Sequence, residues 1–121
     1  MTSQAVNQER IDGADDVLQR LSDTLLARKN SAQESSYTAQ LLASGPNSIL
    51  KKIGEEATEL VIAGKNGDKK ELIWESTDLI YHIMVLLTYY DLRIDDVIEE
   101  VRRRQGVSGL EEKRARPPRS V

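Results

Sequence analysis

Two runs of apolar residues at helical spacing, joined by a short polar turn, constrain the fold more than any other feature of this sequence. Apolar residues that recur every three or four positions form one face of an amphipathic helix. In the first run these are Leu50, Ile53, Ala57, Leu60 and Val61, and in the second they are Leu72, Leu79, Ile80, Ile83 and Leu87. The stretch from Lys51 to Tyr90 therefore predicts two long helices.

The turn between these runs contains residue types that end and begin helices. Gly67 follows Lys65 and Asn66 as a helix stop, and Asp68 with Glu71 three positions later is typical of an N-cap with its capping partner. A connection this short places the two helices antiparallel. The sequence therefore predicts a helical hairpin folded about Gly67.

Four carboxylates occupy matching positions in the two predicted helices. Glu56 and Glu59 are three residues apart, so they share one helix face. Glu75 and Asp78 have the same spacing. Glu59 and Glu75 are equally distant from Gly67 along the chain, and so are the other two. An antiparallel hairpin therefore brings the four side chains into one small volume.

Carboxylates held this close repel one another, and burial increases the cost. A divalent cation resolves the conflict. Oxygen ligands favour Mg²⁺, with Mn²⁺ as the second choice, and a chain with no cysteine and one histidine argues against zinc. The alternative is a solvated acidic helix face, which is the usual interpretation of a single EExxE motif. Two motifs matched across a hairpin favour the metal site.

These motifs and their neighbours resemble a known enzyme family. The pattern EExxE followed by ExxD is similar to that of the all-α nucleoside-triphosphate pyrophosphohydrolases, which include MazG-type enzymes and helical dUTPases. More specific segments resemble phosphoribosyl-ATP pyrophosphohydrolase of histidine biosynthesis: SYTAQLLASG (36–45), KKIGEEATELVIAGKN (51–66), ESTDLIYHIMVLL (75–87) and RRRQGVSGLEEK (102–113). Ser76 and Thr77 stand where that pattern has two alanines, and Gln105 stands where it has a histidine or similar residue.

The resemblance implies Mg²⁺-dependent hydrolysis of phosphoribosyl-ATP to phosphoribosyl-AMP and pyrophosphate, the second step of histidine biosynthesis. It also implies a homodimer and places the segment 36–38 near the nucleotide. We expect the metal ligands to be Glu56, Glu59, Glu75 and Asp78, and the substrate-binding residues to be Ser36, Tyr37, Thr38, Lys51, Lys52 and His82. For the segment 36–38, a serine N-cap followed by a packing tyrosine is an equal alternative.

Three residues are candidates for catalysis: Lys52, Glu55 and Glu56. Lys52 lies one turn before Glu56, where it either neutralises a phosphate or forms an ion pair with Glu56. Glu55 either supports the ligands, activates the attacking water or is simply exposed. His82 lies one turn after Asp78, and we place it behind the ligands or against substrate, although a lone histidine on a helix is more often structural.

The rest of the chain predicts flanking helices. They span about 13–29, where the apolar face is Leu18, Leu21, Leu25 and Leu26, then 36–43, and finally a segment from about 94 to 104. Trp74 and Tyr81 are expected to pack against another helix, with contact to a nucleotide base as the alternative. We expect a single all-α domain over 1–121, with 1–10 and 110–121 as flexible ends. A second copy would complete a four-helix bundle around the hairpin.

Composition limits the other classes of protein. A core without phenylalanine is aliphatic, as helix packing favours, and a net charge of −3 argues against a nucleic-acid partner. The first ten residues lack an apolar signal core and no apolar run is long enough to span a bilayer, so we expect a cytoplasmic protein without a membrane partner. Two alternatives stay open: a MazG-type enzyme that acts on other triphosphates, and a non-enzymatic helical interaction module.

Overall fold

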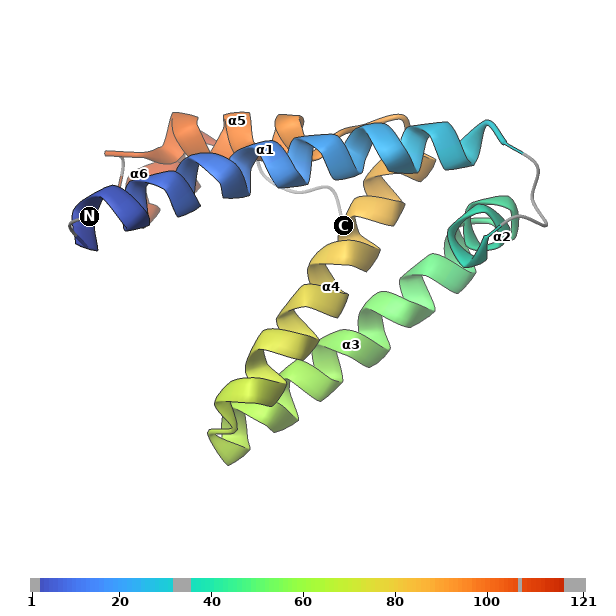
Figure 1. Cartoon of the computed structure of the whole chain (residues 1–121), viewed down its shortest axis with the longest axis horizontal. Coiled ribbons are helices and arrows are strands. Elements are labelled where there is room, and N and C mark those ends of the chain that lie inside the picture. The colour runs from blue at the N-terminus through green and yellow to red at the C-terminus, as the bar shows by residue number, and fades with distance from the viewer. Residues whose placement is uncertain (1–2, 32–35, 107, 117–121) are drawn as a thin grey trace.

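Six α-helices form the part of the chain that the computed structural model describes, residues 3–31, 36–106 and 108–116 (Figure 1). They are α1 (Ser3–Lys29), α2 (Tyr37–Ala43), α3 (Pro46–Asn66), α4 (Lys69–Tyr89), α5 (Ile94–Arg104) and α6 (Gly109–Ala115). No strand occurs within these ranges, which confirms the predicted all-α class. None of the described helices combines the length and the apolar character needed to cross a membrane.

The helices α3 and α4 form the predicted antiparallel hairpin, and they diverge from the turn toward its open end (Figure 1). Gly67 ends α3 with a φ of 66°, a left-handed conformation that costs glycine little because it has no Cβ. The Asp68 carboxylate then accepts a hydrogen bond from the Glu71 backbone N–H at 3.1 Å and so begins α4. These local signals confirm the turn that the sequence predicts.

The short helix α2 also begins and ends where the sequence predicts. The Ser36 hydroxyl accepts a hydrogen bond from the Ala39 backbone N–H at 3.0 Å, which caps the first turn. The chain then turns at Gly45, where φ is 96°, and Pro46 opens α3. Proline is favoured at that position because the first backbone N–H groups of a helix have no partner within the helix.

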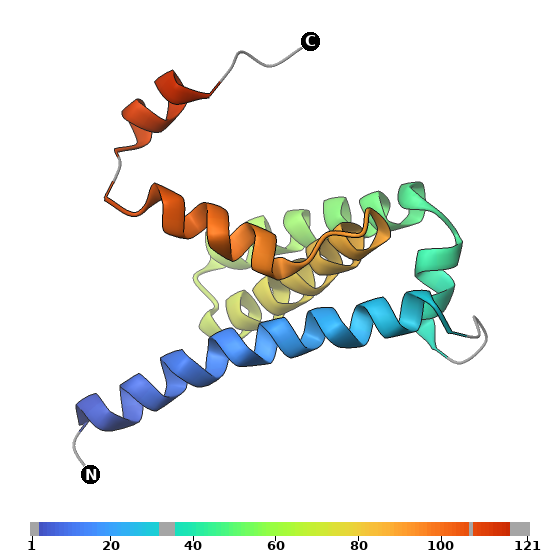
Figure 2. The same cartoon turned by 90° about the horizontal axis from the view of Figure 1, so that it is seen from above.

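The hydrophobic core lies at the open end of the hairpin, where α1, α2 and α5 meet it. Its buried members come from α1 to α5 and are Leu25, Leu41, Leu42, Ile49, Met84, Val85 and Ile94. The helix α1 contacts α2, α4 and α5, while the tip of the hairpin extends away from this junction (Figures 1 and 2). The predicted apolar face of α1 is confirmed for Leu18, Leu21 and Leu25, which lie together on this core. Leu26, the fourth predicted member, is not part of it.

Polar contacts fix α1 against the turn between α4 and α5. The Lys29 ammonium donates to the carbonyl oxygens of Thr88 at 3.1 Å and Tyr89 at 2.8 Å, so it satisfies the end of α4. The Ser22 hydroxyl accepts a hydrogen bond from the Ile94 backbone N–H at 3.0 Å. These bonds join segments far apart in sequence, and they hold the open end of the hairpin in place.

Two helix boundaries differ from the prediction. The helix α1 begins at Ser3 rather than near residues 13–15, because the backbone continues through Gly13, whose cost inside a helix is only about 1 kcal/mol. The helix α6 was missed. It begins with a capping box in which Ser108 and Glu111 exchange hydrogen bonds of 3.1 and 3.4 Å. Residues 3–10 thus belong to α1 and 110–115 to α6, and the flexibility of the two ends stays a prediction.

The packing expected of the two aromatic residues on α4 is only half confirmed. Tyr81 is half-buried and packs against the core. Trp74 is 54% exposed, and its ring faces the Lys70 ammonium at 5.9 Å from the ring centre. No helix among the described residues covers Trp74, since this part of α4 lies beyond the reach of α1 and α5.

Candidate functional site

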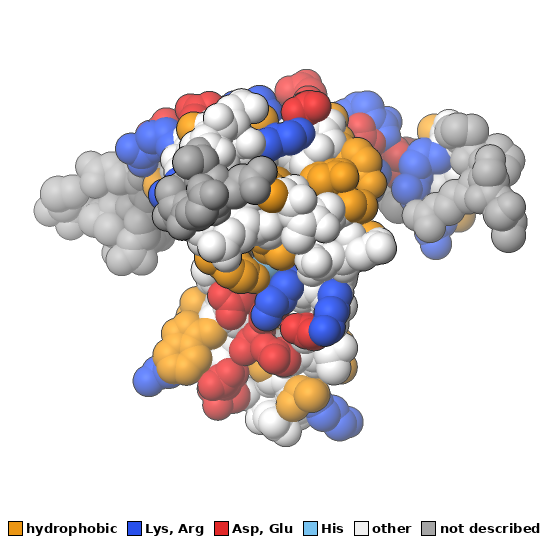
Figure 3. Space-filling model, turned by 90° about the vertical axis from the view of Figure 1, so that its right-hand side faces the viewer, with side chains coloured by type: hydrophobic (Ala, Val, Ile, Leu, Met, Phe, Trp, Pro, Cys, Tyr) orange, Lys and Arg blue, Asp and Glu red, His pale blue; other side chains and the backbone are white. Residues whose placement is uncertain are grey.

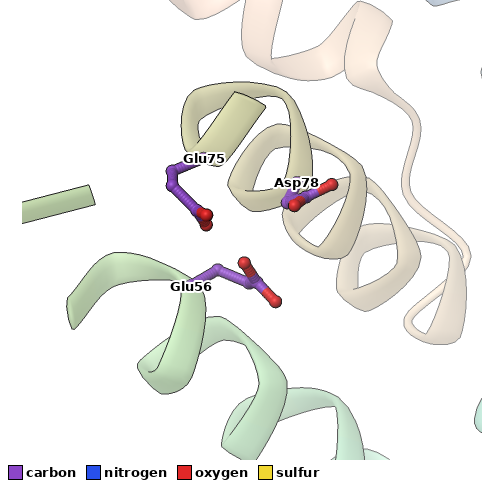
Figure 4. A group of neighbouring side chains, drawn as sticks. All are labelled: Glu56, Glu75 and Asp78. Carbon is purple, nitrogen blue, oxygen red and sulfur yellow. The ribbon is translucent and has the colours of Figure 1, made fainter. Parts of the chain in front are cut away.

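Three carboxylates converge between the two helices of the hairpin. They are Glu56 of α3 and Glu75 and Asp78 of α4, and each offers an oxygen that lies within 4.8 Å of the others (Figure 4). Glu56 and Glu75 point toward one another across the gap between the helices, with Asp78 beside them (Figure 4). The antiparallel register about Gly67 produces this meeting, as the matched spacing predicts.

Glu59, the fourth predicted ligand, lies next to Glu75 rather than within this group of three. It is exposed, and it acts on Glu75 strongly enough to be the largest influence on the pKa of that residue. The structure therefore brings all four predicted carboxylates to one side of the hairpin, with Glu75 at their centre. Their role as metal ligands stays a prediction.

The electrostatics of the group are unfavourable for carboxylates alone. A hydrogen bond with Glu59, then burial, then a hydrogen bond with Glu56 raise the pKa of Glu75 to about 7. Glu56 is only 9% exposed. One buried oxygen of Glu56 and one of Glu75, both Oε2, have no hydrogen-bond partner within the described part of the chain. Buried acceptors without partners are costly, and a cation would satisfy both.

The donor set fits a hard divalent cation. All three converging groups are carboxylates, which are the ligands that Mg²⁺ and Mn²⁺ prefer. The carboxylates differ in exposure, since Glu56 is buried, Glu75 half-buried and Asp78 exposed. A site built this way is anchored on its inner side and open on its outer side, where a substrate phosphate can approach.

A pocket of about 390 Å³ adjoins the carboxylates on the side toward the turn. Its lining includes Glu59 and Glu75 and continues to Asp68 and Glu71. Figure 3 shows acidic side chains gathered on one face of the protruding hairpin, with lysine or arginine side chains close by. Sequence reasoning assigned Glu71 to capping alone, although its position one turn before Glu75 is a signal that it shares the same face.

The lysine predicted to act beside the ligands makes a different ion pair from the one considered. The Lys52 ammonium lies 3.6 Å from a carboxylate oxygen of Glu55. The predicted ion pair between Lys52 and Glu56 is therefore wrong, because Glu55 is the partner. Tyr37 of α2 and then Glu55 raise the pKa of Lys52. Lys51 is exposed. The basic side chains thus lie on the rim of the site next to α2.

The predicted histidine is held by protein contacts. His82 is 8% exposed, and its Nδ1 lies 2.8 Å from the backbone oxygen of Asp78. Its Nε2 lies 3.5 Å from the Tyr37 hydroxyl, and its ring packs edge-on against Tyr37 and Tyr81. These contacts favour the structural interpretation of His82 over direct contact with substrate.

The segment 36–38 divides between the surface and the interior. Tyr37 is 53% exposed, whereas Thr38 is 4% exposed and shares a hydrogen bond with the Tyr81 hydroxyl. Sequence reasoning expected Tyr81 to pack or to contact a base, and so missed this bond. No local pattern predicts it, because it depends on how α2 is placed against α4.

Comparison with known proteins identifies the family. The family model described as phosphoribosyl-ATP pyrophosphohydrolase matches residues 18–105 of this chain. The chain belongs to this family. The matched region contains α2, α3 and α4, and therefore all four carboxylates.

Curated relatives extend over most of both sequences. A phosphoribosyl-ATP pyrophosphatase of Dechloromonas aromatica is 55% identical over 101 residues, which cover 84% of this chain and 94% of the relative. The protein of the same name from Geotalea daltonii is 52% identical, over 84% of this chain and 96% of the relative. The one from Bordetella parapertussis is 53% identical, over 85% and 92%. The similarity thus extends over nearly the whole length of these phosphoribosyl-ATP pyrophosphatases.

Proposed function

We propose that this protein hydrolyses the α–β phosphoanhydride of phosphoribosyl-ATP to give phosphoribosyl-AMP and pyrophosphate in histidine biosynthesis. The observation that carries the proposal is the convergence of Glu56, Glu75 and Asp78 within a member of this family. Hydrolysis of a triphosphate chain needs positive charge against its oxygens and a positioned water, and this acidic site can hold a cation that meets the first need. We place the reaction in the cytoplasm, because a phosphorylated nucleotide does not cross membranes unaided.

Mg²⁺ is the cofactor that we propose, with Mn²⁺ as a substitute. Glu56, Glu75 and Asp78 would hold it, and Glu59 would contribute beside Glu75. When bound, the ion supplies charge that neutralises the triphosphate oxygens as the anhydride breaks. Glu56 fixes the inner side of the site because it is buried, while the exposed Asp78 faces the side from which substrate arrives.

The residues on the rim bind the substrate in this proposal. Lys52, with Lys51 beside it, offers positive charge to the leaving pyrophosphate, and the raised pKa of Lys52 keeps its ammonium charged. Glu55 holds Lys52 through their ion pair, which favours a positioning role for Glu55 over that of a base. Tyr37 is exposed enough to touch the nucleotide.

The other predicted substrate-binding residues act from behind this rim. Ser36 caps α2, and Thr38 and His82 are buried. Their burial favours indirect support of the substrate over contact with it. The rim then consists of side chains from α2 and α3, and the carboxylates lie behind it between α3 and α4.

Pyrophosphate release with Mg²⁺ tests the proposal directly. Phosphoribosyl-ATP, ATP and dUTP are compared at equal concentration, and we expect strong preference for phosphoribosyl-ATP. Preference for an ordinary nucleotide would instead indicate a MazG-type enzyme with the same carboxylates. No release from any of these substrates would contradict the enzyme and favour the interaction module.

The metal site has a test of its own that needs no substrate. We expect Mg²⁺ to raise the melting temperature of the protein, because an ion that binds only the folded state stabilises it. Glu56→Gln and Asp78→Asn should each abolish most of that rise. Glu99→Gln, which removes an exposed carboxylate on α5, is the matched control and should preserve it. An unchanged rise in both site variants would remove those residues from the metal site.

We also propose that the protein is a homodimer. One flank of the hairpin exposes the apolar side chains Leu50, Val61, Ile73, Ile80 and Ile83. Helical spacing places this apolar flank on the side of the hairpin away from Glu56 and Glu75. Two such flanks packed together would complete a four-helix bundle and leave the carboxylates accessible. Light scattering that shows a stable monomer at micromolar concentration would contradict the dimer.

A further inference from the structure

The two halves of α2 are attached to the rest of the molecule by different means. Leu41 and Leu42 anchor its second half in the hydrophobic core. Its first half is joined to α4 by the hydrogen bond between Thr38 and Tyr81. A helix of seven residues is too short to be stable alone, so the position of its first turn depends on these attachments.

That first turn carries the residue of α2 that faces the site. Tyr37 opens the helix, and its hydroxyl lies 3.5 Å from His82 Nε2 on α4. It is also the largest influence that raises the pKa of Lys52 on α3. His82 lies one turn after Asp78, and Lys52 lies one turn before Glu56. Tyr37 therefore contacts α4 one helical turn beyond Asp78, on the side of the carboxylates away from Gly67.

The Thr38 hydroxyl is well placed to hold this turn. It is 4% exposed, so its bond to Tyr81 is protected from competing water. The Tyr37–His82 contact is longer and more exposed, and it is the weaker of the two polar links between α2 and α4. The adjacent Thr38–Tyr81 bond is then the main polar restraint on the direction in which Tyr37 points.

We propose that Tyr81 is a positioning residue for the nucleotide, which acts by fixing the first turn of α2 through Thr38. This inference rests on the proposed function, and it assigns Tyr81 to the substrate rim rather than to the metal ligands. Tyr81 lies on the flank of α4 that faces α2, whereas Glu75 and Asp78 lie on the face toward the carboxylate group. Loss of its hydroxyl frees α2 and leaves the hairpin ligands in place.

The variant Tyr81→Phe tests this directly, since it removes the hydroxyl and keeps the ring that packs on the core. We expect KM for phosphoribosyl-ATP to rise about two- to tenfold, the range that one lost neutral hydrogen bond gives. The value of kcat should change less than twofold, and the Mg²⁺-induced rise in melting temperature should equal that of the wild type. A merely structural role would lower stability without this separation of KM from kcat and metal binding.

Further variants isolate the bond itself. Thr38→Val should raise KM as Tyr81→Phe does, and Thr38→Ser, which retains the hydroxyl, should restore KM to near the wild-type value. The double variant Thr38→Val with Tyr81→Phe should be no worse than either single variant, because both remove the same bond. Tyr89→Phe is the matched control on α4. Its hydroxyl has no hydrogen-bond partner within the described residues, so its KM should not change.

The outcomes separate this inference from the proposed function. A wild-type protein that releases no pyrophosphate from phosphoribosyl-ATP contradicts the proposed function. An active wild type with an unchanged KM in Tyr81→Phe overturns the positioning role alone. A rise in KM that is matched by a fall in the Mg²⁺ response also overturns it, because the hydroxyl would then support the metal site. A Thr38→Ser variant as impaired as Thr38→Val would likewise exclude the hydrogen bond as the cause.

Discussion

Glu75 is the residue whose chemistry is most altered by its surroundings. It stands between Glu59 and Glu56, and its pKa is raised to about 7. One of its oxygens is buried without a hydrogen-bond partner among the described residues. A carboxyl group in this state holds a proton where an exposed glutamate would be charged. Protons and a divalent cation therefore compete for the same place in the molecule.

This competition predicts how stability depends on pH. The pKa of Glu75 is higher in the folded protein than the ordinary value of 4.5, so its contribution to stability is fully present below pH 4.5 and is lost as pH rises through about 7. Without metal, the unfolding free energy of the wild type should therefore fall over this range relative to that of Glu75→Gln. Urea unfolding of both proteins in EDTA between pH 4.5 and 8 measures the difference. Parallel curves would show that Glu75 titrates normally.

At the scale of the element, the hairpin depends on one backbone conformation. Gly67 has a φ of 66°. A Cβ atom at this position would have no atom of the described residues within 4 Å, so only the backbone conformation disfavours a side chain there. Gly64, on the last turns of α3, has an ordinary helical conformation, and a Cβ there would lie 3.8 Å from Leu72. The two glycines thus differ in the cause of any effect that an added methyl group would have.

The corresponding prediction compares two alanine variants. Gly67→Ala should lower the free energy of unfolding by about 1 kcal/mol, because alanine is strained in the left-handed conformation. Gly64→Ala should be neutral or slightly stabilising, since alanine favours the helix and its methyl group makes an ordinary contact. Chemical denaturation of both variants gives the two values. Equal losses would contradict the proposed importance of the Gly67 conformation.

The ends of α3 and α4 at their turn and the meeting of the carboxylates could be predicted because both follow from local spacing. Gly67 and Asp68 predict a turn from local sequence alone. That turn sets the positions of Glu56 and Asp78 along the axes of the two helices. The rotation of each helix about its axis could not be predicted, since it is set by packing at the core. That rotation decides that Glu56 is buried while Glu59 is exposed. It also explains why the Thr38–Tyr81 bond was missed.

At the scale of the whole molecule, the hairpin extends away from the layer formed by α1 and α5 (Figures 1 and 2). Its apolar flank is therefore not covered by the described part of the same chain, and the exposed fractions reach 71% at Val61 and 67% at Ile73. Aliphatic side chains this exposed along both helices of a hairpin are typical of a surface that another chain covers. The proposed dimer accounts for them.

A charge placed on this flank should separate the subunits. Ile73→Asp would bury an unpaired carboxylate in the proposed four-helix bundle, so we expect mostly monomer at a concentration where the wild type is a dimer. Leu110→Asp on α6, where leucine is 60% exposed, is the control and should leave the dimer intact. Light scattering or sedimentation distinguishes these results. A dimeric Ile73→Asp variant would place the interface on another surface.

The short turn at Gly67 also has a consequence for the order in which the protein folds. The carboxylates that converge all lie within residues 56–78, so a single local hairpin supplies all of them. Contacts between residues near in sequence form fast, because little chain entropy is lost in closing the loop between them. We therefore expect the hairpin to form early in folding, before α5 packs against α1. A cation held by these carboxylates would then stabilise the hairpin before the rest of the core has packed, and the ion would act as an early aid to folding.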